Sequence, residues 1–238
     1  MRLLFFISLI ILFAACKKDN TTAQTAPSYK IATVSEIGNS VNANYTFSYD
    51  DSGRISQIVS IGLDPFTKTF SYKGDTIYVT IHEGAHASNA IITLNSFKLI
   101  STRNITFQQS VNDVSYNYDA SGQIVSLTAQ AGSYTYPAIT YTTTNGDITN
   151  TTSQGVSDTT TYFTEKTSVI GNLDDFYQLL TYGAFYYRNK HLKKSYESGS
   201  NKTDYSYSFD SEGKIISVVT SYNLGAAPYT TNFTYTKQ

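Results

Sequence analysis

Apolar or aromatic residues alternate with small polar residues over most of this chain. Tyr45, Phe47 and Tyr49 are separated by Thr46 and Ser48, a period of two that places the three rings on one face of a strand. Aromatic and hydroxyl-bearing residues suit a pleated surface with one buried face. The pattern therefore predicts strands with an aromatic inner face and a hydroxyl-rich solvent face.

Three of these strands run into the same turn sequence, at residues 45–55, 114–124 and 205–215. In each, an aspartate is followed three residues later by a glycine and five residues later by an isoleucine. The carboxylate can accept backbone N–H bonds at the start of a type I turn, and the glycine can adopt the positive φ of the closing bulge. We interpret the following residues as structural turn formers rather than catalytic or metal-binding groups: Asp50, Gly53, Asp119, Gly122, Asp210 and Gly213.

The three copies are unevenly spaced, which argues against a propeller or solenoid of constant period. Shorter hairpin signals lie between them, at Gly74–Asp75 and at Asn145–Gly146, and residues 92–96 resemble a copy that has lost its glycine. We predict an all-β domain over residues 29–238. It would be one long antiparallel meander that forms a curled sheet or a partly open barrel, with its strand register least certain over residues 84–112.

Residues 172–183 interrupt the strand pattern with a helical one. Asn172 can cap the start of the helix and Gly183 can close its end. We predict a short amphipathic helix that plugs an open sheet end or covers a concave face, with partner binding as the alternative. The apolar stripe, at positions i, i+3, i+4 and i+7, consists of Leu173, Phe176, Tyr177 and Leu180.

The N-terminus has the features of an exported protein. Residues 1–15 contain one basic residue and then an apolar run that is too short to span a bilayer, which predicts a signal peptide. Cys16 follows Ala14 and Ala15, an ending that resembles the bacterial lipobox. We predict that Cys16 carries the lipid and that residues 16–28 form a flexible tether. The alternative is a plain signal peptide followed by a chance cysteine.

Charge and cysteine content exclude several classes of protein. The net charge is −1, and 15% of the residues are charged, so no basic footprint for nucleic acid is present. Cys16 is the only cysteine, and an intrachain disulfide is therefore impossible. The densest basic stretch, residues 188–194, could contact anionic lipid or acidic glycans, or it could be a solvated loop that leads into a strand.

One motif suggests catalysis. His82, Glu83 and His86 match H-E-x-x-H, in which a helix presents both histidines to zinc and the glutamate activates water. Here residues 76–81 predict a strand that runs straight into His82, and Gly84 weakens any helix. We therefore expect a hairpin end rather than a metal site, and no other sequence motif predicts a catalytic or metal-binding group.

The hairpin units resemble YD-type repeats, and residues 29–238 resemble a Bacteroidota-type lipoprotein family of unknown function with a porin-like fold. The strand at residues 161–163, the helix at 173–182 and the hairpin at 205–215 carry the resemblance best. Cys16-Lys17-Lys18-Asp19 also looks like the mature start of such lipoproteins. The resemblance implies architecture and a cell-envelope location, and it transfers no functional residue.

These observations predict a lipoprotein of the outer membrane, held there by its N-terminal lipid. We expect it to be a non-catalytic binding or structural module without a cofactor, and a glycan or a hydrophobic molecule is the possible ligand. The alternative is a zinc-dependent hydrolase that uses the motif at residues 82–86.

Overall fold

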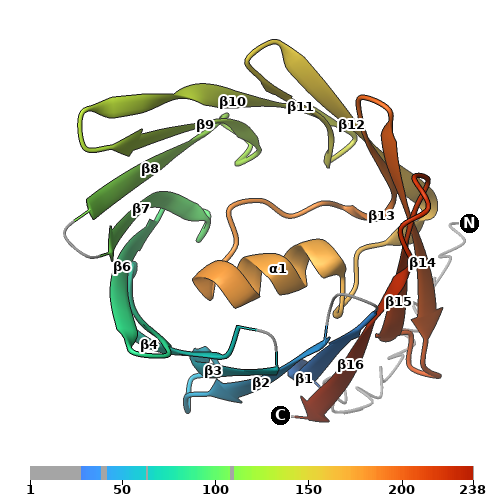
Figure 1. The fold of residues 1–238 in the computed structure, drawn as a ribbon, viewed down its shortest axis with the longest axis horizontal. Coiled ribbons are helices and arrows are strands. Elements are labelled where there is room, and N and C mark those ends of the chain that lie inside the picture. Colours follow the sequence, from blue (N-terminus) through green and yellow to red (C-terminus); the bar gives the residue numbers. More distant parts are fainter. Residues whose placement is uncertain (1–27, 39–41, 63, 108–109, 238) are drawn as a thin grey trace, which may run out of the picture.

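The computed structural model describes residues 28–38, 42–62, 64–107 and 110–237, which form a ring of antiparallel strands around one helix (Figure 1). The predicted signal peptide, Cys16 and nearly all of the tether lie outside these residues. The strands are β1 (Tyr29–Ile37), β2 (Asn42–Tyr49), β3 (Ile55–Gly62), β4 (Phe66–Lys73), β5 (Thr76–Glu83), β6 (His86–Leu94), β7 (Ile100–Phe107), β8 (Ser110–Tyr118), β9 (Ile124–Ala131), β10 (Tyr134–Thr144), β11 (Asp147–Ser153), β12 (Val156–Thr167), β13 (His191–Ser198), β14 (Asn201–Phe209), β15 (Ile215–Tyr222) and β16 (Tyr229–Lys237).

The sheet is a closed barrel, because β1 pairs with both β2 and β16. Each strand pairs antiparallel with its neighbours in the sequence, and the Tyr29–Lys237 pair begins the closing seam. The predicted all-β meander is thus confirmed, and the structure resolves the choice between a curled sheet and a barrel in favour of full closure. Within the described residues, closure pairs both edges of the sheet with each other.

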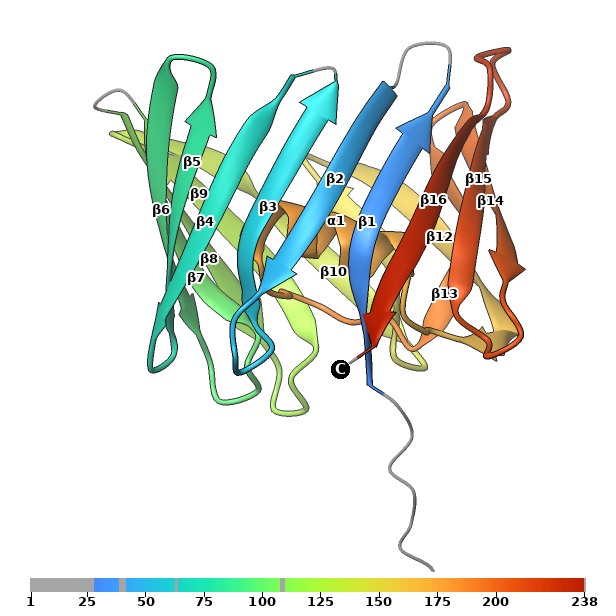
Figure 2. The same cartoon turned by 90° about the horizontal axis from the view of Figure 1, so that it is seen from below.

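Helix α1 (Leu173–Tyr182) lies inside the barrel, across its middle (Figures 1 and 2). The predicted helix is confirmed, including its cap at Asn172 and its left-handed closing residue Gly183, which has a φ of 67°. Within the described ranges, no helix has the length and the apolarity that crossing a membrane requires. Leu173 and Phe176 of α1 are buried, and they belong to the core of the barrel.

The core sits between this helix and the inward face of the strands. Ile58, Leu192, Ile215 and Val218 are all inaccessible to solvent, and Phe176 of α1 is buried among strand aromatics. Because strand side chains alternate between faces, the intervening positions point outward. A barrel of this size would otherwise enclose a wide channel, so the helix fills space that the sheet alone cannot.

The Asp-x-x-Gly turns have one common geometry, which Asp50 illustrates. Its Oδ1 accepts the N–H groups of Ser52 at 3.0 Å and Arg54 at 2.9 Å, and Gly53 has a φ of 75°. The copy that lacks a glycine, between β6 and β7, makes the same turn. Asn95 replaces the aspartate, and Lys98 occupies the glycine position with a φ of 60°. The turn therefore accepts a residue with a side chain at the positive φ that glycine adopts in the other copies.

Tyrosines near the ends of alternate strands tie each strand to the one before it. Each phenol donates a hydrogen bond to a backbone carbonyl near the start of the preceding strand, inside the barrel. Burial raises the pKa of Tyr72 in this set to about 12, so its phenol stays a neutral donor at physiological pH. The pairs are Tyr49 to Ile31, Tyr72 to Ile55, Tyr118 to Ile100, Tyr162 to Ile148, Tyr207 to Lys193 and Tyr235 to Ile215.

Candidate functional site: a cation-lined cavity at one mouth of the barrel

Aromatic packing holds α1 in the lumen. Phe176 is fully buried, and the centroid of its ring lies 5.6 Å from Tyr45, 6.3 Å from Phe47 and 5.7 Å from Phe233. Edge-to-face contacts of this kind contribute beyond the area that they bury. The rings come from β2 and β16, which lie close to the seam of the barrel. The helix is therefore packed against the part of the wall where the chain begins and ends.

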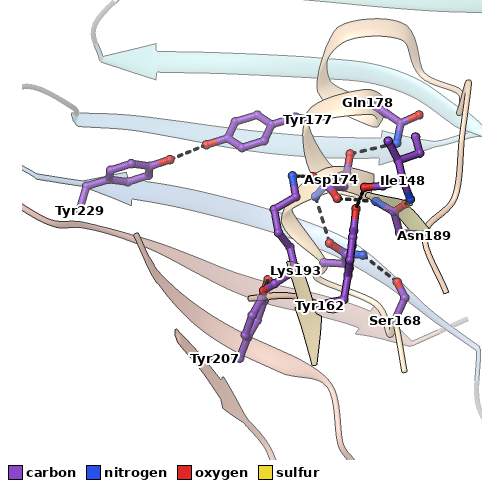
Figure 3. A network of polar contacts seen from close by, with 11 residues as sticks. Ile148, Tyr162, Ser168, Asp174, Tyr177, Gln178, Asn189, Lys193, Tyr207 and Tyr229 are labelled. Carbon is purple, nitrogen blue, oxygen red and sulfur yellow. Dashed lines mark hydrogen bonds and ion pairs between the residues drawn. The ribbon is translucent and has the colours of Figure 1, made fainter. Parts of the chain in front are cut away.

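A buried polar network holds the N-terminal turn of α1 against β13 and the irregular segments on either side of the helix (Figure 3). The carboxylate of Asp174 accepts hydrogen bonds from Lys193 Nζ at 2.5 Å and Asn189 Nδ2 at 2.9 Å. Asn172 caps the helix by accepting from the Asp174 N–H, and it donates to Ser168 Oγ. Because buried polar groups need partners, this network orients α1 as well as anchoring it.

A cavity of about 910 Å³ lies at the mouth where β1 begins and β16 ends. One wall is the face of α1 that carries Asp175 and Leu179, together with the closing residue Gly183. The other walls are the start of β1, the β2–β3 turn, and residues 168–171, 185 and 188–190. Its volume is within the range of small-molecule sites. Four cationic residues line it: Lys30, Arg54, Arg188 and Lys190.

Contacts with aromatic rings position three of these cations. Lys30 Nζ lies 4.9 Å from the centroid of Tyr49, the Arg54 guanidinium lies 4.3 Å from that of Tyr72, and the Arg188 guanidinium lies 4.2 Å from that of Phe185. Such contacts attract a cation to the ring face and restrict its position. The cationic groups are thus held in place before any ligand arrives.

The cations differ in how many of their donors are already used. Arg54 forms an ion pair with Asp50 at 2.7 Å, and Lys30 donates to the carbonyl of Gly53. Among the described residues, the side chains of Arg188 and Lys190 have no hydrogen-bond acceptor. These two side chains therefore provide most of the unused donor capacity in the cavity.

One carboxylate, Asp175, faces the same cavity, and it forms no hydrogen bond within the described part of the chain. Burial raises the pKa of the Asp175 carboxyl to about 6; the charge of Arg188 opposes this rise, and the charge of Asp174 adds to it. Because the folded pKa lies above the ordinary value of 3.8, the folded state binds this proton more tightly. The contribution of Asp175 to the stability of the folded protein is therefore most favourable at low pH, and it is lost as pH rises through about 6.

Replacing Asp175 with asparagine should stabilise the protein at neutral pH, where the wild-type carboxylate is charged and partly buried. A shift of about two pKa units corresponds to ~3 kcal/mol, which we reduce to ~1–2 kcal/mol for partial solvent screening. Urea unfolding of both proteins at a series of pH values measures this. The gain should vanish near pH 3.8, and an equal gain at acidic and neutral pH would contradict the assignment.

The sequence-predicted turn residues lie at the same end of the barrel as this cavity. Gly53 lines it, and Gly122 lines a neighbouring cavity of about 410 Å³ that shares Arg188 and Asn189 with it. Asp210 accepts from the N–H groups of Glu212 and Lys214. In all three copies the aspartate forms local turn contacts, and in the first two copies the neighbours of the aspartate line a cavity.

The H-E-x-x-H residues lie in a tight hairpin. His82 and Glu83 end β5, His86 begins β6, and Glu83 is paired with His86 across the turn. Directly paired residues share a face, and successive residues alternate between faces. His86 is therefore on the side of the sheet opposite to His82. No cluster of His, Cys, Asp and Glu suited to a metal ion occurs among the described residues.

The basic stretch at residues 188–194 divides among several environments, which the sequence alone does not separate. Arg188 and Lys190 face the cavity, His191 Nδ1 lies 2.6 Å from Asp147 Oδ2, and Lys193 pairs with Asp174. Lys194 is exposed. In the sequence these residues form one basic run, and Lys30, Arg54 and Asp175 lie outside it. The only sign of this site in the sequence was the density of positive charge in residues 188–194.

No protein-family model matches the chain, and no curated protein matches it in sequence. The fold is nevertheless shared with solved structures. A crystal structure of a porin-like protein from Bacteroides uniformis superimposes with a TM-score of 0.65 at 16% identity, over 86% of this chain and 96% of the other. A porin-like protein from Bacteroides vulgatus gives a TM-score of 0.56 at 14% identity, over 87% and 98%.

This chain has a porin-like fold. At these identities the comparison shows the architecture alone. It agrees with the fold that the hairpin repeats and the C-terminal third of the sequence imply. The comparison therefore concerns the arrangement of the strands, and it transfers no property of the inner or outer surface to this chain.

The outer face of this porin-like barrel is polar. Neighbouring strands exchange hydrogen bonds between exposed side chains, whereas a barrel that crosses a membrane presents an apolar band about 25 Å tall. Exposed apolar side chains such as Tyr78 and Ile91 interrupt this polar face without replacing it. The exposed bonded pairs are Thr33–Thr234, Thr80–Asn89, Asn104–Asp113, Asn117–Ser126, Asn150–Thr159 and Thr152–Ser157.

Proposed function

We propose that this protein is a lipid-anchored binding protein of the bacterial cell envelope that neither conducts solutes nor catalyses a reaction. The observation that carries the proposal is the apolar packing of α1 inside the barrel, with Phe176 buried among the wall residues. A conducting barrel needs a polar, water-filled lumen. Here α1 and the wall side chains that pack on it form a hydrophobic core within the lumen.

The polar outer face supports attachment through a lipid rather than insertion of the barrel. Charged and polar groups that face hydrocarbon are costly, whereas several acyl chains on Cys16 would hold the protein firmly at a membrane. β1 begins at Tyr29, beside the cation-lined cavity. A tether from Cys16 would therefore leave the barrel at the mouth that contains this cavity.

The arrangement of the hairpin at residues 82–86 favours binding over hydrolysis. His82 and His86 lie on opposite faces of the sheet, and a catalytic zinc site needs its ligands to converge on one metal ion. The cavity at the mouth instead combines fixed cations with apolar walls, an arrangement typical of ligand recognition. A lipid carried deep in the barrel is disfavoured because α1 occupies that space.

A fractionation experiment tests the anchor and the topology together. The variant is the full chain with Cys16→Ser, in which a cleavable secretion signal replaces residues 1–15. We expect the native chain to sediment with membranes and to require detergent, and the variant to be folded and soluble in the periplasmic fraction. A variant that still needs detergent would show that the barrel itself enters the membrane, and the proposal would then be wrong.

A further inference from the structure

The cation-lined cavity has an apolar wall opposite its unused donors. Val169, Ile170, Leu179 and Phe185 are partly buried and contribute side chains to its lining. These groups remain partly in contact with solvent in the free protein. A ligand that covers them would gain the free energy of removing apolar surface from water.

The neutral polar groups of the cavity are already engaged. Asn189 donates to Asp174 and accepts from the backbone N–H of Ile148, and Ser168 Oγ accepts from Asn172. A ligand with many hydroxyl groups would therefore find few free neutral partners. This argues against a sugar as the main body of the ligand.

The aromatic rings of the cavity are also occupied on one face each. Lys30 lies over Tyr49, Arg188 lies over Phe185, and Lys214 Nζ lies 3.8 Å from the ring centroid of Tyr29. A sugar that stacked on these ring faces would have to displace the cations that lie over them. The rings position cations here, and positioned cations favour the binding of an acidic group.

We propose that this cavity binds an amphipathic anion, an aliphatic carboxylate in its simplest form. The acidic head would contact Arg188 and Lys190, whose donors have no acceptor within the described residues, because ionised pairs of this kind form strong hydrogen bonds. The aliphatic body would lie along the wall formed by Val169, Ile170 and Leu179. This inference rests on the proposed function and names its ligand class.

The charge of Asp175 predicts an effect on affinity that nonspecific apolar binding would not produce. Asp175 projects into the same cavity as the four cations, and an ionised Asp175 would repel an anionic head. Replacing it with asparagine should therefore tighten binding, whereas removing a cation should weaken it. Opposite effects from neighbouring positions would identify an electrostatic site.

Titration calorimetry on the soluble Cys16→Ser chain at neutral pH tests this. Decanoate is the probe, 1-decanol is the neutral analogue with the same chain, and glucuronate is an acid without an aliphatic body. We expect decanoate to bind one site per chain, and both analogues to bind at least about tenfold more weakly. Arg188→Gln and Lys190→Gln should each weaken decanoate binding about tenfold, and Asp175→Asn should tighten it.

Lys194→Gln is the matched control, because Lys194 is exposed like Lys190 and carries the same charge but does not line the cavity. It should leave decanoate binding unchanged. Equal affinity for 1-decanol, tighter binding of glucuronate, or an equal loss in Lys194→Gln would overturn the proposal.

The acidic head could also belong to a membrane lipid. Vesicles that contain phosphatidylglycerol separate this source from a free acid. We expect monomeric decanoate to give a larger calorimetric response than the vesicles. Binding only to vesicles would overturn the assignment of a soluble ligand. If no probe binds while the variant remains folded without detergent, the ligand inference fails and the proposed function stands.

Discussion

Phe176→Ala should destabilise the protein by about 3–5 kcal/mol, the usual cost of truncating a fully buried phenylalanine. Phe176 has no exposed surface, and it joins α1 to Tyr45, Phe47 and Phe233 of the barrel wall. The substitution removes the ring and leaves a cavity that the surrounding strands cannot fill, because β2 and β16 are held in a closed hydrogen-bonded wall. A loss of this size is a large share of the stability of an ordinary domain.

Urea unfolding at neutral pH measures this cost, and limited digestion with trypsin gives a second measurement. If α1 is loosened, the adjoining segment that contains Arg188 and Lys190 should be cut faster. Tyr78→Ala is the matched control, because Tyr78 is 43% exposed on the barrel and its loss should cost less than about 1 kcal/mol. Similar costs for the two variants would mean that α1 does not pack in the lumen in solution.

The local part of this structure could be predicted from the sequence, because its causes are local. The alternation around Tyr45 and Phe47 predicts an inward aromatic face, and both side chains are buried in the barrel. The helix at 172–183 has its cap, its apolar stripe and its closing glycine within one short segment. Each of these signals depends on residues close together in the chain, where backbone preferences are strong.

The closure of the barrel could not be predicted in the same way. The pairing of Tyr29 with Lys237 joins the two ends of the described domain, and alternation states which face a residue occupies but not which strand lies next to it. The position of α1 raises the same difficulty. An apolar stripe requires burial, and both the concave face and an open sheet end satisfy that requirement.

The candidate site was missed because its residues have no shared motif. Lys30 begins a strand, Arg54 belongs to a turn, and Arg188 and Lys190 lie in an irregular segment after the helix. Each side chain is ordinary for its own position. Only the closure of the barrel and the packing of α1 bring them around one cavity, so the site depends on long-range contacts that periodicity does not encode.

Asp174→Ala should destabilise the protein by about 3–5 kcal/mol, because it breaks one side of a buried ion pair. The side chain of Asp174 is 8% exposed and that of its partner Lys193 is 19% exposed, and their charged atoms lie 2.5 Å apart. Removing the carboxylate leaves Lys193 and the amide of Asn189 without their acceptor inside the barrel. An uncompensated buried charge costs more than the pair contributes.

The exposed pair of Lys98 and Asp75 provides the control, since its ionised atoms are also 2.5 Å apart but its side chains are 68% and 53% exposed. Asp75→Ala should cost less than about 1 kcal/mol, because water replaces the lost partner. The double variant Asp174→Ala with Lys193→Met should regain part of the loss, since no charge is then left unpaired. Urea unfolding of the three variants measures these differences. If Asp174→Ala costs no more than Asp75→Ala, the network drawn in Figure 3 does not hold the helix in place.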